Sequence, residues 1–234
     1  MASGLKYKYI FFDLDRTLWD FETNSSLVLR EIYTMYGLDK HFSSFARFVE
    51  RYNYHNDKLW NDYRKGLTTK DILRNLRFEL TLEDAGIKDP QLCSVIGDFY
   101  LDQSPKKNML FPGSIEILEY LKSRGYHLYI LTNGFRKTQV DKMANSGITA
   151  YFERLYTSEE IGYNKPGREI FHWAVTSLNA RKSECIMIGD DNEVDIEGAA
   201  AYGIDSIWFN PENSREPTRA NHIVSSLDQI REVL

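Results

Sequence analysis

The sequence predicts an α/β protein in which a Rossmann-like, doubly wound parallel sheet forms the core and an α-helical domain is inserted into it. Two observations predict this class. Short apolar runs of strand length alternate with helical patterns, and one long helical segment interrupts the alternation after the first run. Strands that alternate with helices form parallel sheets covered on both faces, and right-handed crossovers make such sheets doubly wound.

The predicted strands are rich in Ile, Tyr and Phe and are flanked by turn residues or charges. They cover residues 7–13, 126–132, 154–157, 184–189 and 205–209. Helical patterns lie between them, at 114–123, 136–145, 168–178 and 194–201. We therefore expect one parallel sheet whose strands come from both ends of the chain.

The inserted segment covers residues 19–107 and shows Tyr, Phe, Arg and Glu at helical spacing with almost no strand pattern. Glycines divide it into stretches that fit four or five helices, and the sheet pattern resumes near Pro112 and Gly113. The predicted domains are therefore a core made of 1–18 and 108–234, and an α-helical domain made of 19–107.

Composition excludes several classes of protein. A net charge of −5 argues against a protein that binds a nucleic acid polymer or an anionic membrane. The two cysteines, Cys93 and Cys185, are far apart and form no CxxC pair, so neither a zinc site nor a disulfide framework is expected. Residues 1–8 lack a signal-peptide pattern and the apolar runs are too short to span a membrane, which indicates a cytoplasmic protein.

Chemically useful residues follow the predicted strands. The first strand ends at Asp13 and is followed by Asp15, the second leads into Thr132-Asn133-Gly134, a later loop carries Lys165, and the fourth leads into Asp190. Ligands bind beyond the carboxyl ends of parallel strands, where the strand order reverses. Each residue alone is compatible with an ordinary turn or cap, but together they indicate one site.

The residue types point to phosphoryl chemistry. With strand-like geometry, Asp13 and Asp15 lean to the same side, and Asp190 adds a third carboxylate, a set that suits Mg²⁺. The Thr132 hydroxyl and the following backbone amides lie where a helix begins, which favours a phosphate group. One carboxylate then attacks phosphorus while a second acid protonates the leaving oxygen.

These segments resemble the four motifs of the haloacid dehalogenase (HAD) superfamily, with the helical insertion at the position of that family's C1 cap. They are Asp13-Leu14-Asp15-Arg16-Thr17, Thr132-Asn133-Gly134, Lys165-Pro166 and the run from Gly189 to Asp195. The resemblance implies that Asp13 is the nucleophile and a Mg²⁺ ligand, and that Asp15 is the general acid and base, with its backbone carbonyl on the metal.

The same resemblance implies roles for the other motif residues. Thr132 and the amide of Asn133, with Gly134, would hold the phosphate, and Lys165 would stabilise the nucleophile and the phosphoryl group. Asp190 would ligate Mg²⁺, and Asp195 would act beside the metal or through water. The roles of Arg16 and Asp191 stay open.

The acid at position 15 favours a phosphatase over a dehalogenase, because the dehalogenases of this superfamily lack it. A finer resemblance, carried by Trp19, Phe21 and Trp60 among others, is to nucleotidases that act on pyrimidine nucleoside monophosphates. The expected partner is thus a small phosphorylated metabolite, a nucleotide in the first instance, bound by a monomer or a homodimer. Alternatives are a sugar-phosphate or phosphoglycolate phosphatase and, with less support, a dehalogenase, a mutase or a non-catalytic binding protein.

Some residues of the inserted segment are candidates for substrate contact. Trp19 and Phe21 lie just after the first motif, where the chain enters the insertion, and are expected to line the pocket. Arg77 is expected to pair at the surface, and His55, in a charged stretch, is expected to be exposed.

Overall fold

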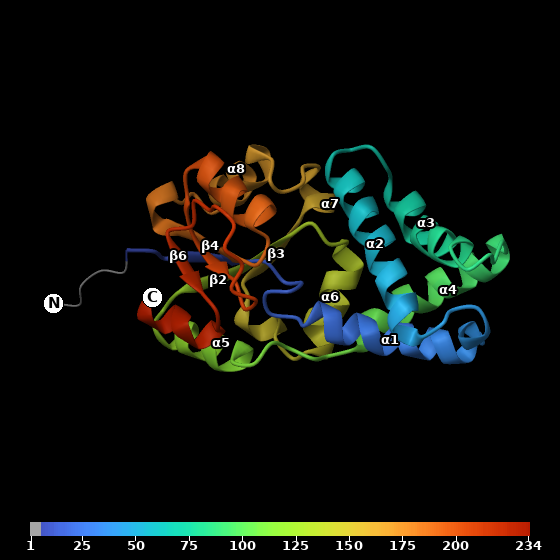
Figure 1. Cartoon of the computed structure of the whole chain (residues 1–234). Coiled ribbons are helices and arrows are strands. Elements are labelled where there is room, and N and C mark those ends of the chain that lie inside the picture. The colour runs from blue at the N-terminus through green and yellow to red at the C-terminus, as the bar shows by residue number, and fades with distance from the viewer. Residues whose placement is uncertain (1–5) are drawn as a thin grey trace. The chain divides into compact units, whose positions relative to one another are not determined.

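A computed structural model describes residues 6–234 and divides into two compact units (Figure 1). The core unit contains the described residues up to Phe21 together with Asn108–Leu234, and the helical unit is Glu22–Lys107. Residues 1–5 begin the predicted core range 1–18 and the segment expected to lack a signal peptide, and they lie outside the described residues. No helix in the described part of the chain is long and apolar enough to cross a membrane.

The core unit is built on a six-stranded parallel sheet with the order β3-β2-β1-β4-β5-β6. The strands are β1 Tyr9–Phe12, β2 His127–Thr132, β3 Arg154–Thr157, β4 Cys185–Gly189, β5 Asp205–Phe209 and β6 His222–Val224. The chain runs outward from β1 through β2 to β3, then returns to the other side of β1 as β4. The predicted doubly wound fold is confirmed, and the strand order reverses between β1 and β4.

Edge strand β6 is absent from the prediction because only three residues form it, two of them exposed, and the local pattern does not distinguish them from a loop.

Successive residues of β1 face opposite sides of the sheet, as the period of a strand requires. Ile10 and Phe12 belong to one apolar cluster and Phe11 belongs to the other. Helices α5 (Ser114–Ser123) and α6 (Arg136–Asn145) contribute to the first cluster, and α8 (Arg168–Ser177) and α9 (Gly198–Tyr202) contribute to the second. Both faces of the sheet are therefore covered by helices.

The predicted helix at 194–201 is replaced by two elements. A π-helix, Asn192–Glu197, precedes α9, and its wide turn is marked by the N–H of Ile196 on the carbonyl of Asp191. Gly198 begins α9 where a Cβ atom would lie 2.9 Å from the ring of Phe171, so the chain needs a residue without a side chain there. The wide turn buries Asp195 beyond the carboxyl end of β4.

The helical unit packs four helices around its own apolar core: α1 Phe21–Met35, α2 Phe45–Arg64, α3 Lys70–Glu83 and α4 Pro90–Gln103. Polar side chains begin three of them. Ser44 accepts from the N–H of Arg47, and Thr69 accepts from the N–H of Ile72. Asp89 directly precedes the proline that begins α4 and accepts from the N–H groups of the second and third residues of that helix. These caps satisfy amide groups that a helix otherwise leaves without partners.

Two surface predictions for this unit are wrong. His55 is buried, and its Nε2 lies 2.8 Å from Oδ2 of Asp84. Arg77 is also buried, its Nη1 donating to Oδ1 of Asn56 and its guanidinium lying 4.7 Å from the centre of the Tyr100 ring. Both residues lie in polar stretches of sequence, but each is on the face of its helix that packs inward.

Candidate active site

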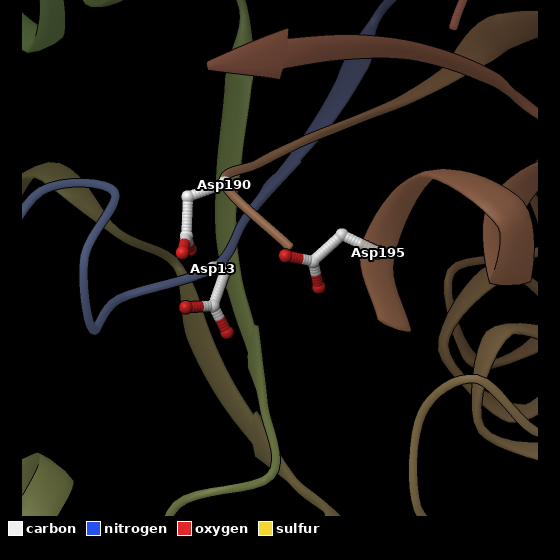
Figure 2. A group of neighbouring side chains, drawn as sticks. All are labelled: Asp13, Asp190 and Asp195. Carbon is white, nitrogen blue, oxygen red and sulfur yellow. The ribbon is translucent and has the colours of Figure 1, made fainter. Parts of the chain in front are cut away.

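The carboxylates of three aspartates gather at the point where the strand order reverses (Figure 2). Asp13 directly follows β1, and its N–H donates to the carbonyl of Ile188 on the neighbouring strand β4. Asp190 follows β4, and Asp195 comes from the π-helix beyond it. One carboxylate oxygen of each residue lies within 4.8 Å of the other two.

Lys165 joins two of these acids. Its Nζ lies 2.6 Å from Oδ1 of Asp13 and 2.6 Å from Oδ1 of Asp195, although the residue is only 1% exposed. Burial alone would lower the pKa of this lysine, but the two facing carboxylates outweigh burial and raise it. The two carboxylates therefore favour the charged form of Lys165 inside the site.

Burial and mutual repulsion disfavour the charged forms of the clustered acids. Burial raises the pKa of Asp13 to about 7, against the opposing effect of Lys165, and Asp195 adds to the rise. Burial and the neighbouring acids also raise the pKa of Asp190 well above its usual range. An all-oxygen donor set with unfavourable like charges fits a hard divalent cation such as Mg²⁺.

Asp15 does not belong to this cluster through its side chain. Its Oδ1 lies 2.5 Å from Nζ of Lys142, and its Oδ2 accepts from Nε2 of Gln139 at 2.9 Å. Asp15 still acts on Asp13 electrostatically, since it adds to the rise in the pKa of Asp13, but the chain turns after Leu14 instead of continuing as a strand. The N–H groups of Leu18 and Trp19 both donate to the carbonyl of Leu14.

The Thr132-Asn133-Gly134 segment follows β2 and leads to α6. Oγ1 of Thr132 accepts from the N–H of Gly134 at 3.0 Å, which leaves its hydroxyl hydrogen to donate. The Asn133 side chain contacts the backbone of Lys165 twice: Oδ1 accepts its N–H at 2.8 Å and Nδ2 donates to its carbonyl at 2.9 Å. This contact is absent from the prediction, which considered only the Asn133 amide.

Two glycines permit close contacts at the site. A Cβ atom on Gly189 would lie 2.2 Å from Oδ2 of Asp195, so a side chain there would displace that carboxylate. A Cβ atom on Gly134 would lie 1.7 Å from Nε2 of Gln139. These glycines provide space for polar side chains to reach the site.

The two aromatic residues predicted to line the pocket differ in exposure. Trp19 is fully buried in the apolar core of the core unit, and the ammonium of Lys142 lies 4.0 Å from its ring. The structure thus does not bring Trp19 to an open surface. Phe21 is half-buried, and the guanidinium of Arg16 lies 4.5 Å from its ring.

The two positions left open by the sequence have local structural roles. Arg16 has a φ of 64°, in the left-handed region, at the turn after the first motif. Asp191 accepts the N–H of Val194 through its side chain and so caps the π-helix. Gln139 and Lys142, which contact Asp15, are absent from the prediction, since polar residues in a helix of mixed composition usually face solvent.

The family model of haloacid dehalogenase-like hydrolases matches residues 7–203. The chain belongs to this family. The predicted enzyme class, a phosphoric monoester hydrolase of the haloacid dehalogenase type, is confirmed by this match and by the phosphatases and nucleotidases among its relatives.

Similar proteins match over nearly the whole length of this haloacid dehalogenase-like hydrolase. The pyrimidine 5'-nucleotidase PynA of Streptococcus pneumoniae is 31% identical, with 92% of this chain and 88% of PynA aligned. The pyrimidine 5'-nucleotidase YjjG of Escherichia coli is 29% identical over 98% of this chain and 99% of its own. The ribulose-1,5-bisphosphate 5-phosphatase of Halopiger xanaduensis is 30% identical over 96% and 98% of the two chains.

A solved structure also resembles this hydrolase. The crystal structure of the HAD-hydrolase YfnB from Bacillus subtilis, bound to magnesium, superimposes with a TM-score of 0.88 at 26% identity. The match covers 98% of this chain and 99% of YfnB.

Proposed function

We propose that this hydrolase is a Mg²⁺-dependent phosphomonoesterase that forms an aspartyl-phosphate on Asp13, and that its substrates are pyrimidine nucleoside 5'-monophosphates. One observation carries the proposal. The buried carboxylate of Asp13 lies at the end of β1, where the strand order reverses, in contact with the Lys165 ammonium and grouped with Asp190 and Asp195.

The residues present fit the proposed metal. Asp13, Asp190 and Asp195 would hold it, directly or through water, with the backbone carbonyl of Asp15, because they offer only hard oxygen donors and repel one another when ionised. When bound, Mg²⁺ would neutralise charge on the phosphoryl oxygens and so allow a carboxylate to approach phosphorus.

In the first step, the phosphoryl group is transferred from the substrate to Asp13. Lys165 contacts Oδ1 of Asp13, so Oδ2 is the oxygen that this ion pair leaves for attack on phosphorus. A new bond forms between Oδ2 and phosphorus, and the bond between phosphorus and the ester oxygen breaks. Asp15 donates a proton to the departing oxygen. The Thr132 hydroxyl and the amide of Asn133 hold the remaining phosphoryl oxygens, while the N–H of Gly134 donates to Oγ1 of Thr132 and so orients that hydroxyl.

A second displacement restores the enzyme. Asp15, now a carboxylate, takes a proton from a water molecule as that water attacks phosphorus. The bond between phosphorus and Asp13 breaks, and inorganic phosphate leaves. One acid thus acts in both steps, once as a donor and once as an acceptor.

The substrate class rests on the relatives. PynA and YjjG are named pyrimidine 5'-nucleotidases, and both align over most of this chain. Phe21, half-buried beside Arg16, is the aromatic residue of the core unit that we propose contacts the substrate. We assign the C1 cap to residues 19–107, a stretch that largely coincides with the helical unit. We also propose a cytoplasmic location, where the buried free thiols of Cys93 and Cys185 would stay reduced.

A sugar phosphate is the second candidate substrate. The relative that acts on ribulose-1,5-bisphosphate is 30% identical over 96% of this chain, as similar as the nucleotidases. Both candidates require the same site on the core unit and differ only in the group that leaves.

Phosphate release from a substrate panel, with Mg²⁺ or with EDTA, tests the proposal. We expect Mg²⁺-dependent release from dUMP and dTMP, less from AMP, and little from phosphoglycolate or hexose phosphates. The opposite preference would replace the nucleotidase with the second candidate. Asp13→Asn should abolish release while the protein stays folded. Full activity in that variant, or no activity of the parent on any phosphomonoester, would contradict the catalytic mechanism.

A further inference from the structure

Helix α6 presents two polar side chains to Asp15, one to each carboxylate oxygen. Lys142 contacts Oδ1 at 2.5 Å, and Gln139 donates to Oδ2 at 2.9 Å. We refer to Gln139 and Lys142 as the Asp15 cradle. Both residues lie in the core unit with Asp15, one turn apart on the same helix.

Burial sets the cradle apart from ordinary surface polar residues. Gln139 is 1% exposed and Lys142 is 3% exposed. Placing an ammonium and an amide in the interior is unfavourable unless specific partners compensate for lost water. For Lys142 those partners are the carboxylate of Asp15 and the ring of Trp19, whose centre lies 4.0 Å from the ammonium. Trp19 therefore packs against the cradle and supports it.

Gly134 shows that the chain makes room for this contact. The three atoms nearest to the position that a Cβ would take on Gly134 all belong to the Gln139 side chain, the nearest being Nε2 at 1.7 Å. With any larger residue at 134, Gln139 would have to leave its place beside Asp15. The Thr132-Asn133-Gly134 segment thus contributes to the acid as well as to the phosphate site.

The other end of the Gln139 amide points to a ligand. Its Oε1 is buried and accepts no hydrogen bond from the residues that the structure describes. A buried acceptor without a donor is unfavourable. A hydroxyl group beside Asp15, first that of the departing alcohol and then that of the attacking water, would supply the donor.

We infer that Gln139 and Lys142 are positioning residues for proton transfer at Asp15; the inference rests on the proposed phosphatase function. Asp15 lies just before the turn at 16–18 and pairs with Trp19 in an isolated bridge, while the partners of its carboxylate come from α6. Proton transfer requires the acid to lie within hydrogen-bond reach of the ester oxygen, and small displacements are costly. The cradle supplies the fixed geometry from a neighbouring helix.

Esters with different leaving groups test this inference. The test compares kcat/KM for two substrates: the alkyl phosphate that the parent hydrolyses fastest and p-nitrophenyl phosphate. This parameter reports the steps up to phosphorylation of Asp13. A nitrophenolate departs with little need for a proton, whereas an alkoxide needs the acid. We expect Gln139→Leu and Lys142→Met each to lower kcat/KM for the alkyl ester by about 10- to 100-fold, and for the aryl ester by less than about threefold.

Further variants separate positioning from damage to the fold. Lys142→Arg keeps a cation beside Asp15, so its kcat/KM for the alkyl ester should lie between the values of Lys142→Met and the parent. Lys122→Met removes an exposed lysine from α5 and should leave both substrates unaffected. In an Asp15→Asn background, Gln139→Leu should have no further effect on the aryl ester.

Two results would overturn the inference. Equal losses of kcat/KM on both esters would mean that the cradle supports the structure of the site in general. Unchanged kcat/KM values would mean that it neither positions Asp15 nor supports the site. In both cases the proposed phosphatase function would stand, since the parent hydrolyses both esters. A parent that hydrolysed neither ester would overturn the proposed function and this inference together.

Discussion

The Asn133 side chain holds the backbone of Lys165 from both sides, accepting its N–H at 2.8 Å and donating to its carbonyl at 2.9 Å. The two residues are 32 positions apart. Because Lys165 also reaches Asp13, Asn133 fixes the segment from which the buried ammonium projects. Its side chain thus connects the end of β2 to the ion pair at the end of β1.

Asn133→Ala should lower kcat for phosphate release by about 10- to 100-fold, because the backbone of Lys165 loses both hydrogen bonds that hold it in place. The change in KM should be smaller, since the backbone amide at 133 remains. A double-mutant cycle with Lys165→Ala, measured on p-nitrophenyl phosphate, checks the mechanism. If Asn133 acts through Lys165, its substitution should have almost no effect once the lysine is gone. Additive losses would show an independent role for Asn133.

The raised pKa of Asp13 predicts a pH-dependent difference in stability in metal-free protein. A carboxyl group whose folded-state pKa is about 7, above its unfolded value, contributes stability that is present at low pH and is lost as the pH rises through that pKa. Asp13→Asn removes this loss. In EDTA, the variant should melt at about the same temperature as the parent near pH 4 and about 7–15 °C higher near pH 8. A difference that stays constant across this range would contradict the raised pKa.

Mg²⁺ should stabilise the folded chain through the three clustered carboxylates. At about 100 times its dissociation constant, a ligand adds roughly 2.7 kcal/mol to the free energy of unfolding, which corresponds to about 5–10 °C in melting temperature for a chain of this size. Asp190→Asn should remove most of this rise. Asp205→Asn is the matched control, because Asp205 begins β5 at the other end of the sheet and pairs with Lys6. An equal Mg²⁺ response in all three proteins would place the ion elsewhere.

Gly134→Ala should reduce activity chiefly by displacing Gln139, whose atoms occupy the space that the new methyl group needs. The expected loss in kcat/KM with the alkyl phosphate is about 10-fold or more. In a Gln139→Ala background that space is open, so the same substitution should add less than about a threefold loss. If the glycine substitution proved equally harmful in both backgrounds, Gly134 would be required for the approach of phosphate itself.

Arg77 should be important for the stability of the helical unit. Its guanidinium donates to Asn56 and stacks near the rings of Tyr100 and Phe78 in the interior. We expect Arg77→Ala to lower the free energy of unfolding by about 2–4 kcal/mol, measured by urea denaturation. Arg77→Lys should recover only part of this loss, since an ammonium lacks the planar surface that stacks.

Lys88→Ala, which removes an exposed lysine paired with Glu83, is the control for Arg77 and should change stability by less than about 0.5 kcal/mol. A loss for Arg77→Ala no larger than that of the control would show that the buried contacts are energetically unimportant.

The order of the five longer strands and of the helices between them follows from the sequence alone, because apolar runs and helical periods are local properties. The sequence also placed Asp13, Lys165 and Asp190 at one edge, since the carboxyl ends of parallel strands share that edge. The short edge strand β6 could not be predicted, because three residues, two of them exposed, are too few to show the alternation of apolar and polar residues that marks a strand.

Which side chains meet at the site depends on how distant segments pack. Asp195, not Asp15, supplies the third carboxylate of the cluster, because a turn after Leu14 points Asp15 toward α6 and a π-helix brings Asp195 inward. The contact between Asp15 and Lys142 joins positions 127 residues apart. Local patterns specify the backbone period of each segment, whereas such a contact depends on how distant segments pack. Asp13, the proposed nucleophile, could therefore be predicted from its motif, whereas Gln139 and Lys142, which contact Asp15, could not.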